Sequence, residues 1–178
     1  GPDGRHRHDR VVFVLEQGEL RYRNMRTLGG LWLAHGPDEV AATLASLGPD
    51  ALEVKRRQFL ERVGRRRGRT KAALMDQSLV AGLGNILVDE ILWQARIHPA
   101  TPVPTLSETQ RDQLFTKMRK VVRRAVEEYD GIDRNQRWLS HVRGSPGARC
   151  PRCREGLERM VVGGRTTYFC PRCQPAVH

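Results

Sequence analysis

All four cysteines of the chain occur in two Cys-x-x-Cys pairs, a spacing typical of a metal site. Each pair can form a knuckle that offers two thiolates, and four thiolates complete the tetrahedron that Zn²⁺ prefers. The residues between the pairs favour two short strands around Gly163-Gly164, a hairpin too small to have its own core. We predict one structural zinc, with disulfides or an iron site as alternatives, bound by Cys150, Cys153, Cys170 and Cys173. Four protein ligands leave no coordination position open, so this zinc is not expected to be catalytic.

The segment Gly82-Leu83-Gly84-Asn85 could form a second kind of site, a cradle for an anion. Glycines let a phosphate approach the backbone, and the free amides at the start of a following helix would point at it. Asn85 could serve there as the N-cap of the helix or as a direct ligand. A lone Gly-x-Gly is also compatible with an ordinary tight turn, and the pattern alone does not decide between them.

Charge favours a polyanionic partner. The 31 Lys and Arg residues exceed the 20 Asp and Glu residues, which gives a net charge of +11. Nine basic residues against one acidic residue lie between Lys55 and Lys71, a run that we expect to be mostly solvated surface. Arg165, directly after the Gly163-Gly164 turn, would stand at the tip of the cysteine-flanked hairpin, where an exposed arginine can also be ordinary surface. No window approaches the roughly 18 consecutive apolar residues of a membrane span.

These candidate sites need elements that position them. A β-hairpin is predicted over residues 10–23, and helices over 38–47, 49–63, 72–80 and 85–95. A longer helix should follow Ser107, which can form a capping box with Gln110, with a buried stripe made by Leu114, Met118, Val121, Val122, Ala125 and Tyr129. Lys117, Lys120, Arg123 and Arg124 would occupy its solvated face. Residues 130–149 have the composition of a linker, and the tail from Cys150 should form a separate small unit.

The segment from Met75 to Leu92, followed by Ile97-His98-Pro99, closely resembles the helix-two-turn-helix motif of the formamidopyrimidine-DNA glycosylase and endonuclease VIII family. The resemblance continues in Leu47-Gly48-Pro49-Asp50, in Lys71, and in the cysteine-rich tail with its Arg165-Thr-Thr-Tyr-Phe segment. It implies an α+β fold: a mainly helical helix-two-turn-helix domain, an N-terminal β-hairpin left from a sheet domain, and a C-terminal zinc-bound β-hairpin. We expect the boundaries to be 1–36 for the sheet-domain remnant, 37–145 for the helical domain and 146–178 for the zinc finger.

The same resemblance implies roles for individual residues. Lys71 and Asn85, with Gly82 and Gly84, would grip the DNA backbone, and Arg165 would hold the phosphates flanking a flipped nucleotide. Arg26 would enter the gap left by flipping. The family's nucleophile and acid/base, an N-terminal Pro-Glu, have no counterpart here, so no catalytic residue is expected in this chain.

The implied function is the damaged-DNA-binding part of a base-excision-repair glycosylase with AP (β-elimination) lyase activity that removes oxidised bases. The expected partner is double-stranded DNA with an oxidised base or an abasic site, bound by a cytoplasmic monomer with no membrane contact. One alternative is a naturally shortened, non-catalytic protein that binds abasic or otherwise damaged DNA. A second alternative is a zinc-stabilised protein-interaction or RNA-binding module.

Overall fold

The structure is a computed structural model that describes residues 4–25, 27, 29–127 and 136–176. The chain divides into two compact units, Gly1–Ala42 and Thr43–His178, which are described separately. The fold is α+β, as predicted, with several helices and two small antiparallel sheets. The helical region and the cysteine-rich tail fall within one compact unit.

The first unit contains the predicted β-hairpin, made of β1 (Asp9–Leu15) and β2 (Gly18–Arg23). The strands are antiparallel, with Val12 opposite Arg21. Asp9 receives ion pairs from both Arg21 and Arg23. The hairpin leads toward α1 (Pro37–Leu44), which has no buried residue. Arg26, predicted from the family resemblance to face the DNA gap, lies outside the described residues.

The second unit is built around a helical core. Its helices are α2 (Arg56–Gly64), α3 (Thr70–Met75), α4 (Asn85–Ala95), the 3₁₀ turn η1 (Val103–Thr105), α5 (Glu108–Glu127) and α6 (Leu139–Val142). The core joins α2, α4 and α5 through fully buried side chains that include Phe59, Val88, Ile91, Leu114 and Met118, and Leu79 from the turn before α4 packs among them. Among the described residues, none of the helices combines the length and apolar character that crossing a membrane requires.

The sequence features of α5 are found in the structure. Ser107 N donates to Gln110 Oε1 at 2.9 Å and Gln110 N donates to Ser107 Oγ at 3.1 Å, so the capping box is confirmed. The apolar stripe packs on the core through Leu114, Met118, Val121 and Val122. Tyr129, the last residue predicted for the stripe, lies outside the described residues.

Three element predictions need correction. Residues 49–55 form turns rather than a helix, because Asp50 pairs with Ala81 through Ala51 N to Ala81 O and Ala81 N to Pro49 O, both at 3.0 Å. The helix predicted to reach residue 80 ends at Met75, where the Asp76 side chain accepts a hydrogen bond from Ser78 N and forms a turn. The segment classed as a linker contains α6, whose Leu139 is fully buried.

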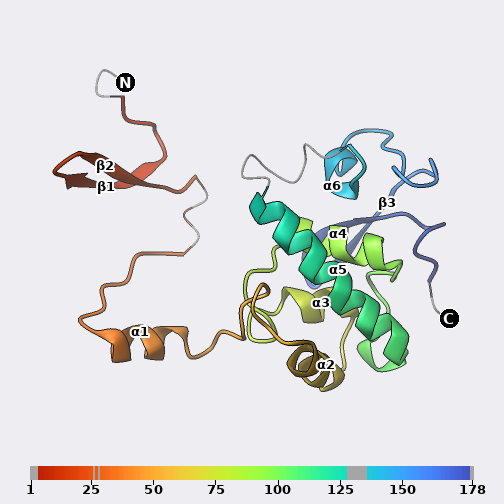
Figure 1. Cartoon of the computed structure of the whole chain (residues 1–178). Coiled ribbons are helices and arrows are strands. Elements are labelled where there is room, and N and C mark those ends of the chain that lie inside the picture. Colours follow the sequence, from red (N-terminus) through yellow and green to blue (C-terminus); the bar gives the residue numbers. More distant parts are fainter. Residues whose placement is uncertain (1–3, 26, 28, 128–135, 177–178) are drawn as a thin grey trace. The chain divides into compact units, whose positions relative to one another are not determined.

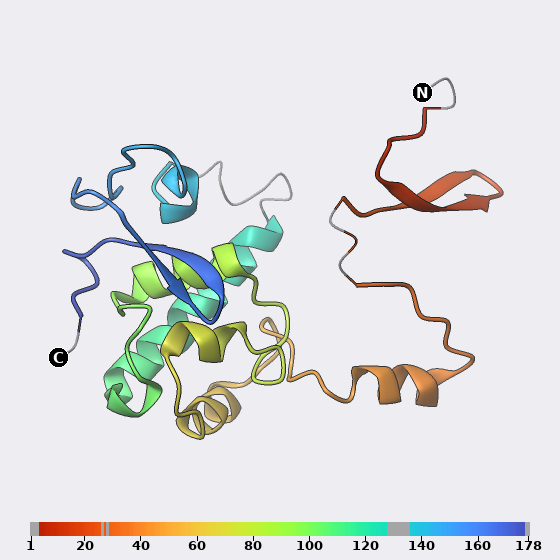
Figure 2. The same ribbon diagram turned by 180° about the vertical axis from the view of Figure 1, so that it is seen from behind.

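Helix α4 is the central element of this unit. It lies between α5 on one side and the hairpin of β3 (Glu158–Val162) and β4 (Arg165–Phe169) on the other (Figures 1 and 2). Four positions spaced by four residues, on α4 and just beyond its end, bond to the cysteine-rich tail: Asn85, Asp89, Trp93 and Ile97. Asn85, Asp89 and Trp93 are four residues apart and share one face of α4, so this face, together with the Ile97 carbonyl beyond the end of the helix, positions the tail.

Candidate nucleic-acid interface and zinc site

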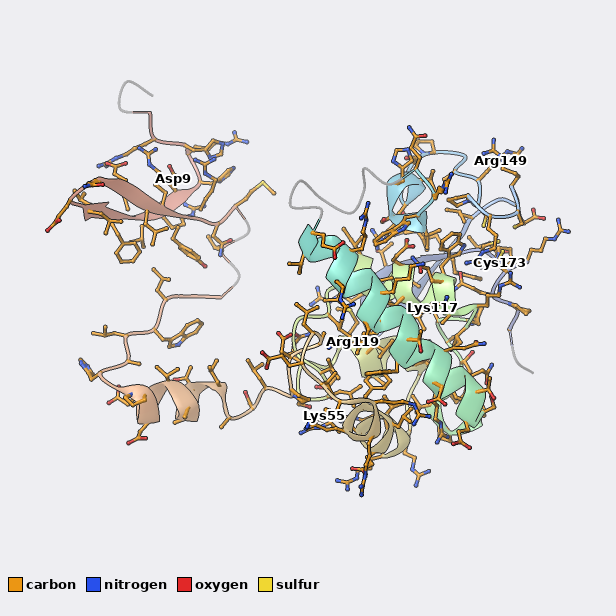
Figure 3. All side chains as sticks on the ribbon, in the orientation of Figure 1. Asp9, Lys55, Lys117, Arg119, Arg149 and Cys173 are labelled. Carbon is orange, nitrogen blue, oxygen red and sulfur yellow. The ribbon has the colours of Figure 1, made fainter. Side chains whose placement is uncertain are left out.

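The four cysteines converge on one point. Their Sγ atoms all lie within 4.8 Å of one another, with Cys153 at 3.5 Å from both Cys170 and Cys173, and Cys150 at 3.9 Å from Cys173. A tetrahedral zinc with Zn–S bonds of about 2.3 Å needs sulfurs about 3.8 Å apart, so the spacing fits zinc. All four cysteines are free thiols, so the disulfide alternative does not hold in this structure. Figure 3 shows Cys173 in this knuckle region.

The knuckles are tied to the end of α4 by polar contacts outside the sulfur cluster. Trp93 Nε1 donates to Cys150 Sγ at 3.3 Å, and the Arg152 guanidinium lies 4.2 Å from the centroid of the Trp93 ring. The buried Gln174 accepts from Cys170 N at 3.1 Å and donates to Ile97 O at 2.9 Å. Such surrounding bonds orient metal ligands, so α4 helps to set the geometry of the sulfur cluster.

The turn predicted to cradle an anion is braced by the side chain of Gln77. Gly82 has φ +93°, a conformation that favours glycine. The Gln77 side chain accepts from Gly82 N at 3.0 Å and donates to Leu83 O at 2.9 Å. Gln77 received no role from the sequence, although it lies in the motif five residues before the glycine it holds. The turn is therefore a fixed structure rather than a loose connection.

Helix α4 begins directly after this turn, and Gly84 is its N-cap. Asn85, which could have been the cap, is instead the first helical residue, and its Nδ2 donates to Thr166 O at 3.0 Å. Its Oδ1 is buried with no hydrogen-bond partner among the described residues. The first turn of α4 carries no acidic side chain. The first hydrogen bond along the helix runs from Val88 N to Gly84 O, so the backbone amides before Val88 are not used by it. The helix start thus offers positive partial charge next to the glycines.

The tip of the β3–β4 hairpin lies against α3. Gly163 and Gly164 have φ of +57° and +72°, as a two-residue turn with two left-handed positions requires. A Cβ on Gly163 would lie 3.3 Å from Ala72 Cβ, which shows how closely the turn approaches the helix. Arg165 follows the turn with an exposed side chain that has no hydrogen bond or ion pair within the described part of the chain. It is available to a ligand.

Lys71 is placed differently from what the sequence indicated. Its side chain is fully buried, and Nζ donates to Asp89 Oδ1 at 2.6 Å and to Thr167 Oγ1 at 2.7 Å. Burial lowers the pKa of Lys71, while the hydrogen bond to Asp89 opposes that shift. The prediction of a direct grip on DNA therefore does not match this structure, in which the ammonium contacts protein atoms. Lys71 links α3 to α4 and β4.

The basic run between Lys55 and Lys71 is not all solvated. Arg62 donates to Ser78 O at 3.0 Å, and Arg66 pairs with Asp76 at 2.9 Å and donates to Ser78 Oγ at 2.9 Å. These two arginines support the segment that precedes the Gly82 turn. Lys55, at the start of α2 (Figure 3), is exposed, as are Arg56, Arg57, Arg65, Arg67 and Arg69.

Glu90 is a buried acid that sequence reasoning did not single out. It accepts hydrogen bonds from Gln94 Nε2 at 2.8 Å and from Ser140 N at 3.0 Å, so it caps the start of α6. Burial raises the pKa of Glu90 from its ordinary 4.5 to about 7. A raised pKa means that folding favours the protonated acid. Its contribution to stability is complete below pH 4.5 and is lost as the pH rises through 7.

Replacing Glu90 with glutamine should therefore change how stability depends on pH. The Glu90→Gln variant does not titrate, so we expect its free energy of unfolding relative to the parent to rise by roughly 3 kcal/mol between pH 4.5 and pH 8. Urea unfolding of both proteins across that pH range measures this change. Any pH-independent loss of stability caused by the amide does not affect it. Glu53→Gln, at an exposed position, serves as control. A difference that stays constant with pH would contradict the assignment.

Comparison with known families agrees with this geometry. A family model described as the formamidopyrimidine-DNA glycosylase H2TH domain matches residues 47–136, which include the braced turn and α4. A second model, a zinc finger found in FPG and IleRS, matches residues 147–176, which contain the four cysteines. Together with the sulfur geometry, the second match identifies the cofactor of this site as one structural zinc.

Individual relatives cover nearly the whole chain. It is 40% identical to the formamidopyrimidine-DNA glycosylase of Symbiobacterium thermophilum, across 98% of this chain and 62% of the relative. The crystal structure of MutM (Fpg) from Thermus thermophilus is 33% identical, with a TM-score of 0.83 over 96% of this chain and 70% of that one. Lactococcus lactis Fpg bound to AP-site DNA is 32% identical, with a TM-score of 0.84 over 97% and 66%. The chain spans about six-tenths of the length of its curated relatives, and it belongs to the formamidopyrimidine-DNA glycosylase family.

Proposed function

We propose that this chain is the damaged-DNA-binding part of a base-excision DNA glycosylase with AP lyase activity that acts on oxidised bases. The observation that carries the proposal is the bond from Asn85 Nδ2 to Thr166 O, because it joins the braced Gly82–Gly84 turn to the residue after Arg165. Two groups suited to phosphate, the start of α4 and an unpaired arginine, are thereby held as one surface. The Lactococcus lactis relative, solved on AP-site DNA, supports the choice of ligand.

Chemistry on a nucleotide inside a duplex requires that the nucleotide leave the base stack. A protein that holds such a distorted duplex must grip the backbone at several fixed points, since phosphate contacts set register and orientation. In this chain, Gly82 and Gly84 leave the protein main chain open to close approach by a phosphate, and Asn85 and Arg165 flank this turn. We assign contacts with the DNA backbone to these four residues. It gives Lys71 a supporting position behind them.

Truncating Arg165 tests the proposal. Arg165→Ala should weaken binding to a duplex with an abasic-site analogue by about 1 to 3 kcal/mol, roughly five- to 150-fold, because a charge-assisted phosphate contact is lost. Fluorescence anisotropy at fixed salt measures this. Arg159→Ala, at an exposed position on β3 of the same hairpin, removes the same charge and should have a smaller effect. Both variants should keep their zinc and their melting temperature. Equal affinity of Arg165→Ala and the parent would refute the proposal.

We propose further that these 178 residues hold DNA without supplying the nucleophile. The amine of Lys71, behind the proposed interface, is fully buried and lies 2.6 Å from the Asp89 carboxylate. Borohydride reduction of the chain on an abasic-site duplex should therefore yield no covalent adduct on a denaturing gel. A family member that begins with Pro-Glu serves as the positive control. An adduct that maps to Lys71, or to the amino terminus, would show that the chain is a lyase by itself.

A further inference from the structure

Three side-chain donors meet at a single backbone oxygen, the carbonyl of Thr166. Asn85 Nδ2 and Arg143 Nη2 each donate to it at 3.0 Å, and Lys71 Nζ lies at 3.3 Å. The donors come from the start of α4, from the residue after α6 and from α3. A carbonyl oxygen has two lone pairs, so three donors, two of them charged, saturate it. The peptide group between Thr166 and Thr167, one residue beyond Arg165, is thus held by donors from three elements.

Asp89 holds the two charged donors in place. Its Oδ1 accepts from Lys71 at 2.6 Å, and its Oδ2 accepts from Arg143 Nε at 2.8 Å and from Tyr168 N at 3.2 Å. The Asp89 side chain is fully buried. Two cations share one carboxylate, so their remaining positive charge is directed at the Thr166 carbonyl. We call Lys71, Asp89, Arg143 and Thr166 the Asp89 cluster.

Arg143 contacts the hairpin at two residues, Thr166 and Tyr168. Besides its bonds to Asp89 and Thr166, its guanidinium lies 4.9 Å from the centroid of the Tyr168 ring. Gly144, directly after it, has φ +84°, and a Cβ there would lie 3.7 Å from Tyr168 Oη. The side chain is 15% exposed, and removing it leaves Asp89 paired with Lys71. Arg143 can therefore be replaced without leaving a buried charge unpaired.

We propose that Arg143 is a positioning residue for DNA binding: through Asp89 and the Thr166 carbonyl it holds the hairpin tip in the orientation from which Arg165 contacts phosphate. The inference rests on the function proposed above. It assigns to Arg143 no contact with DNA of its own. Loss of Arg143 would let the tip move, and binding would then weaken through Arg165 alone.

A double-mutant cycle separates positioning from direct contact. Arg143→Gln in the parent chain should weaken binding to the abasic-site duplex about tenfold. In the Arg165→Ala background, the same change should alter binding by less than twofold, because the contact it supports is already gone. Arg159→Gln removes an equal charge from the hairpin that carries Arg165, and it should have a much smaller effect in either background. Equal losses from Arg143→Gln in both backgrounds, or no loss in the parent, would overturn the proposal.

Amide hydrogen exchange gives a readout that does not depend on DNA. Arg143→Gln should speed exchange at Tyr168 N, which donates to Asp89, at least tenfold, with zinc content unchanged. Arg143→Lys, which keeps the charge and can keep one of the two bonds, should be intermediate in both assays. If Arg165→Ala binds DNA like the parent, the proposed function fails, and exchange at Tyr168 N still decides whether Arg143 holds the hairpin. Unchanged exchange in Arg143→Gln would overturn it.

Discussion

Removal of zinc is expected to unfold the cysteine-rich tail while the helices persist. A structural Zn²⁺ site contributes about 10 to 16 kcal/mol of apparent binding energy, and a two-stranded hairpin is at best marginally stable alone. Without metal, the tail keeps a small apolar cluster around Trp93 and Leu139 and its hydrogen bonds to α4, which are few for a segment of this length. The larger core of α2, α4 and α5 does not include the cysteines, so it should survive.

A strong chelator, with metal analysis and amide exchange before and after, measures this effect. One zinc per chain should be released, exchange protection over β3 and β4 should be lost, and far-UV helical signal should remain. Abasic-site binding should fall at least as far as in Arg165→Ala, since the tip is no longer held. Re-addition of zinc should restore both. A zinc-free chain that keeps its hairpin protection would show that contacts with α4 suffice to fold the tail.

Replacement of Lys71 should produce the second-largest effect. Lys71→Met leaves Asp89 buried with Arg143 as its sole cation among the described residues and removes the bond to Thr167 Oγ1. Breaking one side of a buried ion pair typically costs about 3 to 5 kcal/mol. We expect the free energy of unfolding, measured with urea, to fall by that amount. Lys55→Met, at an exposed position, should change it by no more than about 0.5 kcal/mol.

A double variant shows where the cost arises. Lys71→Met/Asp89→Asn removes both charges, so it should recover part of the stability lost in Lys71→Met. The single variant Asp89→Asn is measured as well. If the double variant loses as much stability as Lys71→Met and Asp89→Asn lose together, the ion pair is not the source of the effect. If Lys71→Met is as stable as the parent, the ammonium is not held as the structure shows.

Local patterns predicted well those features that depend on neighbours in the chain. The capping box at Ser107, the Gly163-Gly164 hairpin and the zinc ligands all rest on short spacings, and the structure contains each of them. The apolar stripe of α5 follows from helical periodicity in the same way. In these cases the physical cause lies within a few residues.

The misplaced features depend on contacts between distant segments. Pro49 and Asp50 have the signature of a helix start, yet they pair with Ala81, which no local pattern reveals. Trp138 to Val142 has a polar, linker-like context, but Glu90 caps it from another helix. Lysine is a residue type that usually lies at the surface, and only the fold brings Asp89 close enough to Lys71 to allow its burial. The family resemblance named residues around the interface without showing which are exposed.

The four-residue spacing of Asn85, Asp89, Trp93 and Ile97 limits how this architecture can be altered. One residue inserted within α4 would rotate everything beyond it by about 100°, so the positions on either side could no longer meet the zinc tail together. The tail is therefore a poor candidate for transplantation as an independent finger. A graft into another helical scaffold would need the three positions on α4, and the Ile97 carbonyl beyond its end, to travel with it. Conversely, a change of length is better tolerated in an exposed loop than within α4.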